Sequence, residues 1–404
     1  MHAMYDIVIV GAGPGGSAAA HFLAQRGLKV LLLDKAEFPR DKTCGDGLTP
    51  RALSVLDEMG IMDKISEAGF RINGIELHAK AGNMMAAPIP DHAHYPNFLM
   101  VVPRLQLDEI IRQQALHSGA DFELARVRGV EQQENHVTVS ADRNGKRIKY
   151  KGRVAILAIG ANMRMLHEME ILHKPPQVLL AARAYYEGMQ GLNDYVQAHF
   201  ANVPLPGYGW VFPISDSTAN VGVGYWQTRN PLRKMPVSAR HAMVEFLNNP
   251  RLKKMLRGAE RIGPIKSYPL RIDFTSAPSH KDRVLLVGES AGLVSPLTGE
   301  GIDFALESGK LAAEFLSDRF EKGELSTPDL ASYDSILRQN FQHIFRFLDY
   351  GRRVYVNPLL MERAVNAANK YADVKRVLVN VMMSQQDPVS LLSLTLVRRI
   401  VLGV

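Results

Sequence analysis

Two apolar runs near the start of the chain predict strands that are buried on both faces. Tyr5–Val10 (YDIVIV) is followed by a glycine-rich turn and by a helical segment over Ala18–Arg26, which Gly27 ends. Lys29–Asp34 (KVLLLD) is the second apolar run. Continuous apolar strands separated by a helix are typical of parallel sheets, so we expect the chain to open with a βαβ unit.

Further strands of the same sheet are expected far along the chain. Val154–Ile159 (VAILAI) is apolar throughout, and Arg283–Val287 (RVLLV) precedes a second glycine-rich loop and a helix that starts near Gly301. Between these runs, Ile72–Met85 and Gln177–Gln227 alternate apolar and polar residues, as antiparallel strands do. The last part of the chain has a mainly helical pattern.

These patterns predict an α/β fold with a discontinuous Rossmann-like domain, an inserted antiparallel β-rich domain that holds the substrate, and a helical C-terminal region. The expected ranges are 1–71, 100–175 and 265–330 for the Rossmann-like domain, 72–99 and 176–264 for the inserted domain, and 331–404 for the helical region.

Composition narrows the class of partner. The chain has 404 residues, of which 46% are hydrophobic, and this is enough for two domains. A net charge of +7 favours anionic partners. The basic residues are scattered and form no nucleic-acid motif, so we expect no nucleic acid partner. The single cysteine, Cys44, excludes a disulfide within the chain and is compatible with the cytoplasm.

We expect no membrane-spanning helix and no secretory signal. No apolar run reaches the roughly 20 residues that span a bilayer, and the first strand begins almost at the N-terminus. The most apolar stretch, Leu391–Val404, contains Arg398 and Arg399 and could lie on a membrane surface without crossing it. We therefore expect a cytoplasmic protein, with peripheral contact at the inner face of the cell membrane left open.

The first glycine-rich turn has the pattern of a dinucleotide-binding fingerprint. Gly11, Gly13 and Gly16 form GxGxxG between a strand and a helix. In this pattern the first glycine permits the tight turn, the second lets the backbone approach a diphosphate, and the third lets helix and strand pack closely. Asp34 ends the next strand and can accept hydrogen bonds from a ribose diol. The alternative is a helix-packing turn with a solvated acid, and the fingerprint alone does not separate FAD from NAD.

The second glycine cluster favours a flavin. Gly299 and Gly301 flank Glu300 and would let the backbone approach a flat ring. The helix that follows directs its positive end at the same place, which would stabilise negative charge on a reduced flavin. Glu289, just after the preceding strand, could hydrogen-bond the ribityl chain.

Three segments carry a resemblance to a known family. Gly288–Ile302 resembles the second FAD motif of flavoproteins related to para-hydroxybenzoate hydroxylase, and is most similar to the geranylgeranyl reductase family. Phe38–Pro50 resembles that family's loop beside the flavin, and Leu205–Pro213 resembles its aromatic motif. The run FPRDKTCGDGLTPRAL is especially similar to bacterial menaquinone reductases, which saturate one double bond of an isoprenoid tail. This chain has Glu289 where the family usually has Asp.

The resemblance implies FAD as the cofactor and an isoprenoid lipid as the substrate. The candidate cofactor-binding residues are Gly11, Gly13, Gly15, Gly16, Asp34, Lys35, Arg40, Cys44, Gly45, Gly47, Arg104, Val127, Gly160, Glu289, Pro296, Gly299, Gly301 and Ile302. Arg104 begins a predicted helix and could pair with phosphate, the alternative being a surface ion pair. Val127 would contact adenine through its backbone, which is compatible with a place in a strand.

A proton donor is expected near the flavin, because an isolated double bond is a poor hydride acceptor. Cys44 is a candidate acid, since a thiol stays protonated at neutral pH, and the alternative is a small buried apolar residue. Asp46 is expected to brace its loop. Tyr208, Trp210 and Phe212 are the expected substrate pocket, because residues two apart on a strand share a face. We expect no metal site.

The electron donor stays open. Related hydroxylases have an Asp-Gly motif after the strand at Val154–Ile159, whereas this chain has Gly160 without that Asp. NAD(P)H, ferredoxin, another electron-donor protein or a different reductant are the alternatives. The missing Asp also counts against an aromatic hydroxylase, and no WxWxIP-type halogenase motif appears, although both classes share the fold. A lipid-binding flavoprotein without turnover is the third hypothesis.

Overall fold

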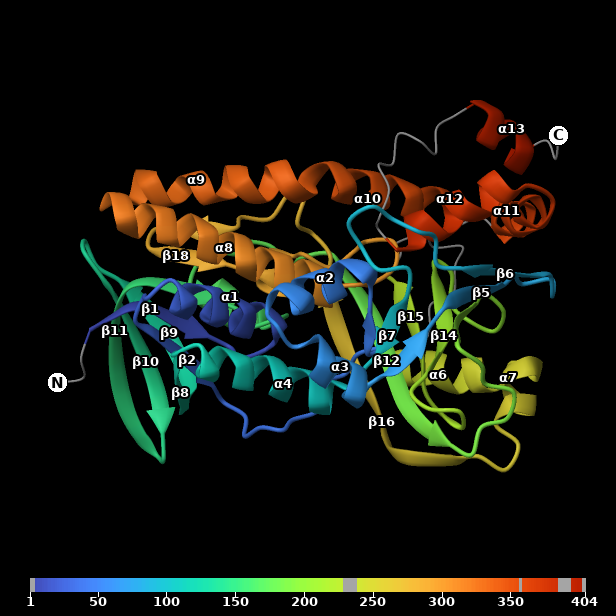
Figure 1. Cartoon of the computed structure of the whole chain (residues 1–404), viewed down its shortest axis with the longest axis horizontal. Coiled ribbons are helices and arrows are strands. Elements are labelled where there is room, and N and C mark those ends of the chain that lie inside the picture. The colour runs from blue at the N-terminus through green and yellow to red at the C-terminus, as the bar shows by residue number, and fades with distance from the viewer. Residues whose placement is uncertain (1–3, 228–237, 356–357, 384–393, 402–404) are drawn as a thin grey trace.

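The first sheet brings together strands that lie far apart in the chain, in a computed structural model that describes residues 4–227, 238–355, 358–383 and 394–401 (Figure 1). Its main path runs in the order β17-β18-β11-β1-β2-β8. The bounds are β1 Tyr5–Val10, β2 Val30–Asp34, β8 Asp121–Leu124, β11 Lys146–Leu157, β17 His280–Lys281 and β18 Val284–Leu286. β1 pairs in parallel with β2 and β11, and β11 with β18, so the predicted buried strands lie side by side.

The parallel strands β1, β2 and β18 consist mainly of apolar residues. Every residue from Ile7 to Val10 is buried, as a strand covered on both faces requires. β9 (Arg126–Gln132) and β10 (Val137–Arg143) extend the sheet beside β11 as antiparallel strands. α1 (Pro14–Gln25) contacts both α4 (Arg104–His117) and α8 (Ile302–Lys322). The predicted Rossmann-like fold is therefore confirmed.

The second sheet has seven strands in the order β16-β12-β15-β14-β13-β5-β6. Its bounds are β5 Gly74–His78, β6 Met84–Pro88, β12 Val178–Glu187, β13 Tyr195–His199, β14 Gly207–Pro213, β15 Thr218–Trp226 and β16 Glu260–Arg271. Neighbouring strands are antiparallel except β13 and β5, which belong to separate stretches of the chain and pair in parallel. α6 (Ala239–Leu247) and α7 (Pro250–Met255) contribute buried residues to a core under this sheet.

The third sheet is small. Its strands are β3 Gly47–Leu48, β4 Phe70–Ile72 and β7 Leu99–Val101, in the order β3-β7-β4. Two short helices, α2 Pro50–Glu58 and α3 Met62–Ala68, connect β3 to β4. A third, α5 Met163–Glu168, lies between β11 and β12. The domain ranges given above stay a prediction; β16 runs across the boundary expected between 264 and 265.

The C-terminal region is helical. α9 (Thr327–Leu337) starts with a capping box formed by Ser326 and Asp329, and leads through a π-helical segment (Arg338–Gln342) to α10 (His343–Tyr355). α11 (Pro358–Lys370), α12 (Ala372–Met382) and α13 (Leu394–Val401) follow, and Figure 1 shows them gathered above the β5–β6 end of the molecule. No helix within the described ranges combines the length and the apolar character needed to span a bilayer.

Candidate active site

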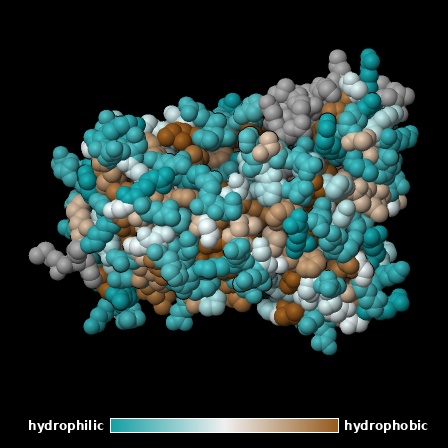
Figure 2. All heavy atoms as spheres, in the orientation of Figure 1, coloured by the Kyte–Doolittle hydropathy of each residue, from teal (hydrophilic) through white to brown (hydrophobic). Residues whose placement is uncertain are grey.

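One cavity of about 970 Å³ joins the carboxyl ends of the parallel strands to the seven-stranded sheet. Of the residues predicted to bind a cofactor or substrate, those that line it are Gly11, Gly13, Gly15, Asp34, Lys35, Arg40, Cys44, Gly45, Gly47, Arg104, Val127, Gly160, Tyr208, Trp210, Phe212, Glu289, Gly299, Gly301 and Ile302. Gly16 and Pro296 are buried and are not among the lining residues. Hydrophilic side chains cover most of the face seen in Figure 2, with hydrophobic ones scattered between them.

The fingerprint turn shows why its glycines are needed. Gly11 has φ +104°, and a Cβ there would lie 2.3 Å from the carbonyl oxygen of Ala158. A Cβ on Gly16 would lie 1.9 Å from the carbonyl oxygen of Gly11, so Gly16 serves the packing of helix on strand rather than the cavity wall. Gly13 precedes Pro14, the first residue of α1, and both line the cavity. The start of α1 therefore faces a space that suits a diphosphate.

Asp34 stands where a ribose would be expected. Its Oδ2 accepts a hydrogen bond from the Ala12 backbone N–H at 2.8 Å, and its Oδ1 accepts one from Ala36 at 2.9 Å. These two bonds hold the carboxylate at the end of β2, beside Lys35. Each carboxylate oxygen can accept a further bond, so a ribose contact is compatible with this geometry.

A buried carboxylate shared by two guanidinium groups lies beside the same cavity. Asp108 accepts from Arg104 Nε at 2.5 Å and Nη2 at 2.7 Å, and from Arg40 Nη1 at 2.8 Å. Arg104 is 4% exposed, so its ion pair is buried and is not the surface pair considered as the alternative. Burial alone would lower the pKa of Arg104, but the Asp108 carboxylate outweighs it and raises that pKa. Two cations facing one anion leave a positive charge at the cavity wall, as an anionic ligand would require.

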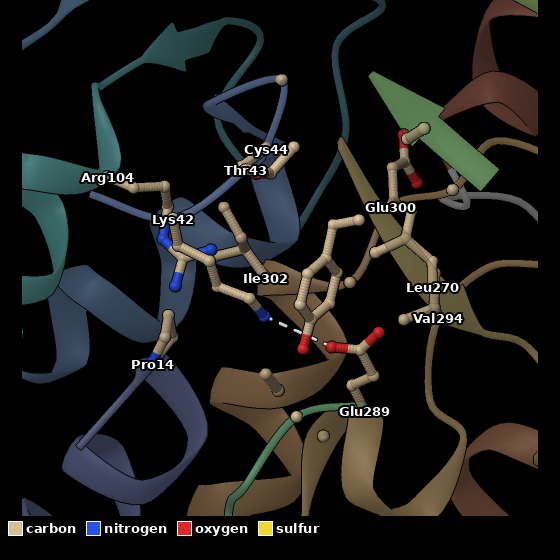
Figure 3. A pocket seen from close by; sticks show the side chains of 18 of the residues that line it. Pro14, Lys42, Thr43, Cys44, Arg104, Leu270, Glu289, Val294, Glu300 and Ile302 are labelled. Atoms are coloured by element: carbon tan, nitrogen blue, oxygen red, sulfur yellow. Dashed lines mark hydrogen bonds and ion pairs between the residues drawn. The ribbon is translucent and has the colours of Figure 1, made fainter. Parts of the chain in front are cut away.

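The second glycine cluster lies opposite the fingerprint turn. Gly301 caps α8, whose first residue, Ile302, faces the cavity. Gly299 has φ +78°, a conformation that favours glycine. Figure 3 shows Pro14 and Arg104 on one side of the space and Glu300 on the other, with Ile302 between them. A flat ring can thus meet the N-terminal end of α8.

Both carboxylate oxygens of Glu289 already have a partner within the protein. Its Oε1 accepts from the Arg271 backbone N–H at 3.1 Å, and its Oε2 pairs with Lys42 Nζ at 3.3 Å (Figure 3). A Cβ on Gly160 would lie 3.2 Å from Glu289 Oε2, so glycine leaves room for this carboxylate. Lys42 and Arg271 were not predicted as site residues.

The loop that carries Cys44 is held by a buried hydrogen-bond network. Asp46 is fully buried, and its Oδ2 accepts from the Tyr185 hydroxyl at 2.6 Å and from Asn220 Nδ2 at 2.7 Å. Burial raises the pKa of Asp46 to about 6, although both hydrogen bonds oppose that shift. Asn220 Nδ2 also donates to the Cys44 carbonyl oxygen at 2.8 Å, and Asn220 Oδ1 accepts from Trp210 Nε1 at 3.0 Å.

Sequence reasoning missed Tyr185 and Asn220. The signal for Asn220 was available, because it is a lone amide within the apolar strand β15 (TANVGVGYW).

Burial raises the pKa of the Cys44 thiol, mainly by desolvation. The thiol therefore stays protonated at neutral pH.

The predicted aromatic residues form one wall. Tyr208, Trp210 and Phe212 alternate along β14, with ring centroids 6.1 and 6.2 Å apart. A Cβ on Gly45 would lie 3.1 Å from the Phe212 ring, so the loop and the wall are in close contact. The Tyr208 hydroxyl donates to the Thr298 carbonyl oxygen and ties the wall to the second glycine cluster.

No group of metal-ligating side chains that could hold an ion occurs in the part of the chain that the structure describes. The cavity instead offers backbone turns and cations at one end and aromatic side chains at the other.

Comparison with known proteins agrees with this geometry. Residues 4–161 match the FAD binding domain family. The menaquinone reductase of Mycobacterium tuberculosis is 33% identical over 326 residues, which cover 78% of this chain and 77% of the relative. Digeranylgeranylglycerophospholipid reductase 1 of Methanothermobacter thermautotrophicus is 26% identical, with 83% and 82% covered.

Solved structures share the fold. A geranylgeranyl bacteriochlorophyll reductase-like protein from Thermoplasma acidophilum superposes with a TM-score of 0.80 at 21% identity, covering 96% of this chain and 98% of that one. The flavin-dependent brominase Bmp2 gives a TM-score of 0.78 at 21% identity, covering 96% and 97%. At such identities the likeness shows the fold and not the reaction.

Proposed function

This chain belongs to the geranylgeranyl reductase family of FAD-dependent oxidoreductases, and we propose that it saturates carbon–carbon double bonds in an isoprenoid tail. Its cofactor is FAD. The observation that carries the proposal is one cavity that joins a dinucleotide cradle to an aromatic wall. Menaquinone tails and geranylgeranyl lipids are the substrate classes that the relatives' names suggest.

The residues present fit FAD along the length of the cavity. The turn at Gly11 and Gly13 with the start of α1 would hold the diphosphate, and Asp34 would accept from the ribose. Arg40 and Arg104 would balance negative charge, and the start of α8 would face the isoalloxazine. When bound and reduced, FAD supplies the hydride for the double bond.

The chain's own side chains would orient the tail and supply the proton. Tyr208, Trp210 and Phe212 offer flat apolar surface that suits a polyene and excludes water. Cys44 lines the cavity with a thiol that burial keeps protonated, so we propose Cys44 Sγ–H as the proton donor. Asp46 accepts two side-chain hydrogen bonds on one oxygen, which suits a bracing carboxylate better than an acid.

Peripheral membrane contact is part of the proposal, because the substrate would come from a bilayer. α13 carries Arg398 and Arg399; Arg399 pairs with Asp373, whereas Arg398 is exposed and Val397 beside it is 43% exposed. Basic and apolar side chains on one short helix suit an anionic lipid surface. Co-sedimentation with anionic but not zwitterionic vesicles tests this part.

The reaction is tested without air. The purified FAD-loaded protein is reduced with dithionite and mixed with menaquinone or a geranylgeranyl lipid, and the lipid is examined by mass spectrometry. The proposal predicts a gain of two hydrogens. A lipid that binds and stays unchanged, or an aromatic compound that is hydroxylated or halogenated in air while no prenyl tail is reduced, contradicts it.

A further inference from the structure

A continuous row of side chains leads away from the Cys44 loop across the seven-stranded sheet. Trp210 Nε1 is 3.6 Å from the position of a Cβ on Gly45, so the row begins at that loop. Trp210 is the cross-strand partner of Ala198, and Ala198 is the partner of Leu77. All three line the cavity. Because neighbouring strands lie about 4.8 Å apart, the row reaches about 10 Å from β14 to β5.

The face of the sheet that contributes this row is apolar. Ile75 and Leu77 on β5 lie beside Val196 and Ala198 on β13, in register, and all four line the cavity. Polar residues alternate with them along both strands: Glu76 and His78 are hydrogen-bonded to each other at 2.9 Å, and the uncharged Gln197 also borders the cavity. Successive strand residues point to opposite faces, so this part of the cavity offers a lipid chain no charged contact from β5 or β13.

Helix α11 packs against the β5–β6 edge of the sheet, one strand beyond the end of the row. The Ala81 backbone N–H, in the turn between β5 and β6, donates to Glu362 Oε2 at 3.2 Å. Asn369 Nδ2 donates to the Met84 carbonyl oxygen on β6 at 2.9 Å. The two bonds fix α11 at the β5–β6 hairpin, at the opposite edge of the sheet from β16.

Methionines face the cavity from this closing layer. Among the described residues, α11 and α12 with the cap of α12 contribute Met361, Met382 and Met383 to its lining. Met361 is 5% exposed and Met383 is 6% exposed, so they are covered from solvent. Arg352 of α10 lines the cavity as well, and its charge is paired with Asp349. Flexible thioether side chains fill an irregular apolar space well.

We propose that Met361 and Met382 form the far end of the substrate chamber and set the length of prenyl tail that can lie with a double bond at the Cys44 loop. The inference rests on the proposed function. A bulkier side chain at this end shortens the chamber and acts against long tails, while a smaller one lengthens it. The two residues are specificity determinants and take no part in the chemistry.

The test compares Met361→Trp, Met361→Ala and Met382→Trp with wild type, each loaded with FAD and reduced with dithionite. Menaquinones with one short and one long tail compete in the same reaction, and mass spectrometry gives the ratio of saturated products. Equilibrium binding of both quinones to the oxidised proteins is a second readout. Met361→Trp and Met382→Trp should shift both ratios toward the short tail by about tenfold or more, the scale at which apolar pockets respond to small changes in size, and Met361→Ala should shift them toward the long tail.

Leu359→Trp is the matched control, because Leu359 lies on the same helix and is 69% exposed. It should leave both ratios unchanged. FAD content and thermal unfolding identify any variant that fails to fold. If the variants at the buried Met361 fail, the test depends on Met382→Trp, because Met382 is only half-buried. Ratios that stay at the wild-type value in Met382→Trp, or equal losses for short and long tails, overturn the length limit. A wild-type protein that saturates neither quinone contradicts the proposed function instead, and its binding ratios still decide the length limit.

Discussion

Asn220 Nδ2 donates to Asp46 Oδ2 across 2.7 Å, joining strand β15 of the second sheet to the loop that carries Cys44. Both side chains are fully buried. The same amide contacts Trp210 and the Cys44 carbonyl oxygen. One side chain thus fixes the aromatic wall relative to the candidate proton donor.

Asn220→Leu should loosen this arrangement. Leucine has a similar volume but removes one of the two side-chain hydrogen bonds of Asp46, which keeps the bond from Tyr185. It also leaves Trp210 Nε1 without this buried acceptor, and each buried group that loses its partner costs about 1–3 kcal/mol. Urea unfolding should show a lower free energy of unfolding. The fold-decrease in the rate of prenyl-tail saturation should be larger than the fold-increase in the rate of FAD release. Asn135→Leu, at an exposed position between β9 and β10, should behave like wild type. Wild-type stability in Asn220→Leu would contradict the claim that the Asn220 hydrogen bonds stabilise the folded protein.

Gly16→Ala should abolish FAD binding or folding. The added Cβ would lie 1.9 Å from a backbone oxygen, and neither Gly11 nor α1 can move away without opening the fingerprint turn. The bound flavin absorbance of the purified protein measures the effect. Gly129→Ala is the control, since no atom lies within 4 Å of the new Cβ. A yellow, stable Gly16→Ala protein would show that α1 is not packed on β1 as described.

Cys44→Ala should lower the rate of tail saturation by about a hundredfold, the scale of general acid catalysis, without loss of bound FAD. Because burial raises the pKa of the thiol, the wild-type rate should not fall with rising pH until beyond the ordinary cysteine range. Single-turnover rates across pH, with Cys44→Ser as a second variant, make the measurement. An unchanged rate in Cys44→Ala assigns the proton to another group.

His199 should make a destabilising contribution in mild acid. Burial lowers its pKa to about 3, while an unfolded histidine titrates near pH 6.5. Between these values the unfolded chain binds a proton at this residue that the folded chain does not, so the contribution of His199 to the free energy of unfolding decreases as pH falls from 6.5, by about 1.4 kcal/mol per pH unit at most.

The neighbouring Glu76 also contributes at low pH, since its hydrogen bond to His78 lowers its pKa. Urea unfolding between pH 7 and 5, with FAD in excess, separates the two because Glu76 titrates below this window. Asp46, whose pKa burial raises to about 6, acts in the opposite direction in this window, so the contribution of His199 is the difference between variants. As the pH falls from 7 to 5, His199→Gln should lose less stability than wild type, whereas His173→Gln, at an exposed site, should match wild type. Equal slopes in the two variants would contradict the assignment.

Much of the scaffold could be predicted, because it depends on local patterns. The apolar runs that became β1, β2, β11 and β18 lie in the expected order, and the helix after Gly301 begins at Ile302. Glycine positions carry their own steric reason, which is why the turn at Gly11 could be recognised.

The interactions that finish the site could not be predicted. Asp108 lies one helical turn beyond Arg104, but its burial and its second contact with Arg40 depend on tertiary packing. Tyr185 reaches Asp46 from a strand some 139 positions away, and only the register of the second sheet decides that meeting. Gly16 and Pro296 belong to motifs that approach the cavity, yet motif membership does not say which residue of a turn faces inward.

The most direct test of the central claim is an anaerobic single turnover. The FAD-loaded protein is reduced, excess reductant is removed, and menaquinone is added while the flavin absorbance is followed and the lipid is collected. The account predicts that the oxidised flavin band returns as the prenyl tail gains two hydrogens, in equal amounts. A flavin that stays reduced beside a bound prenyl lipid, or that reoxidises while the tail keeps all its double bonds, would contradict it.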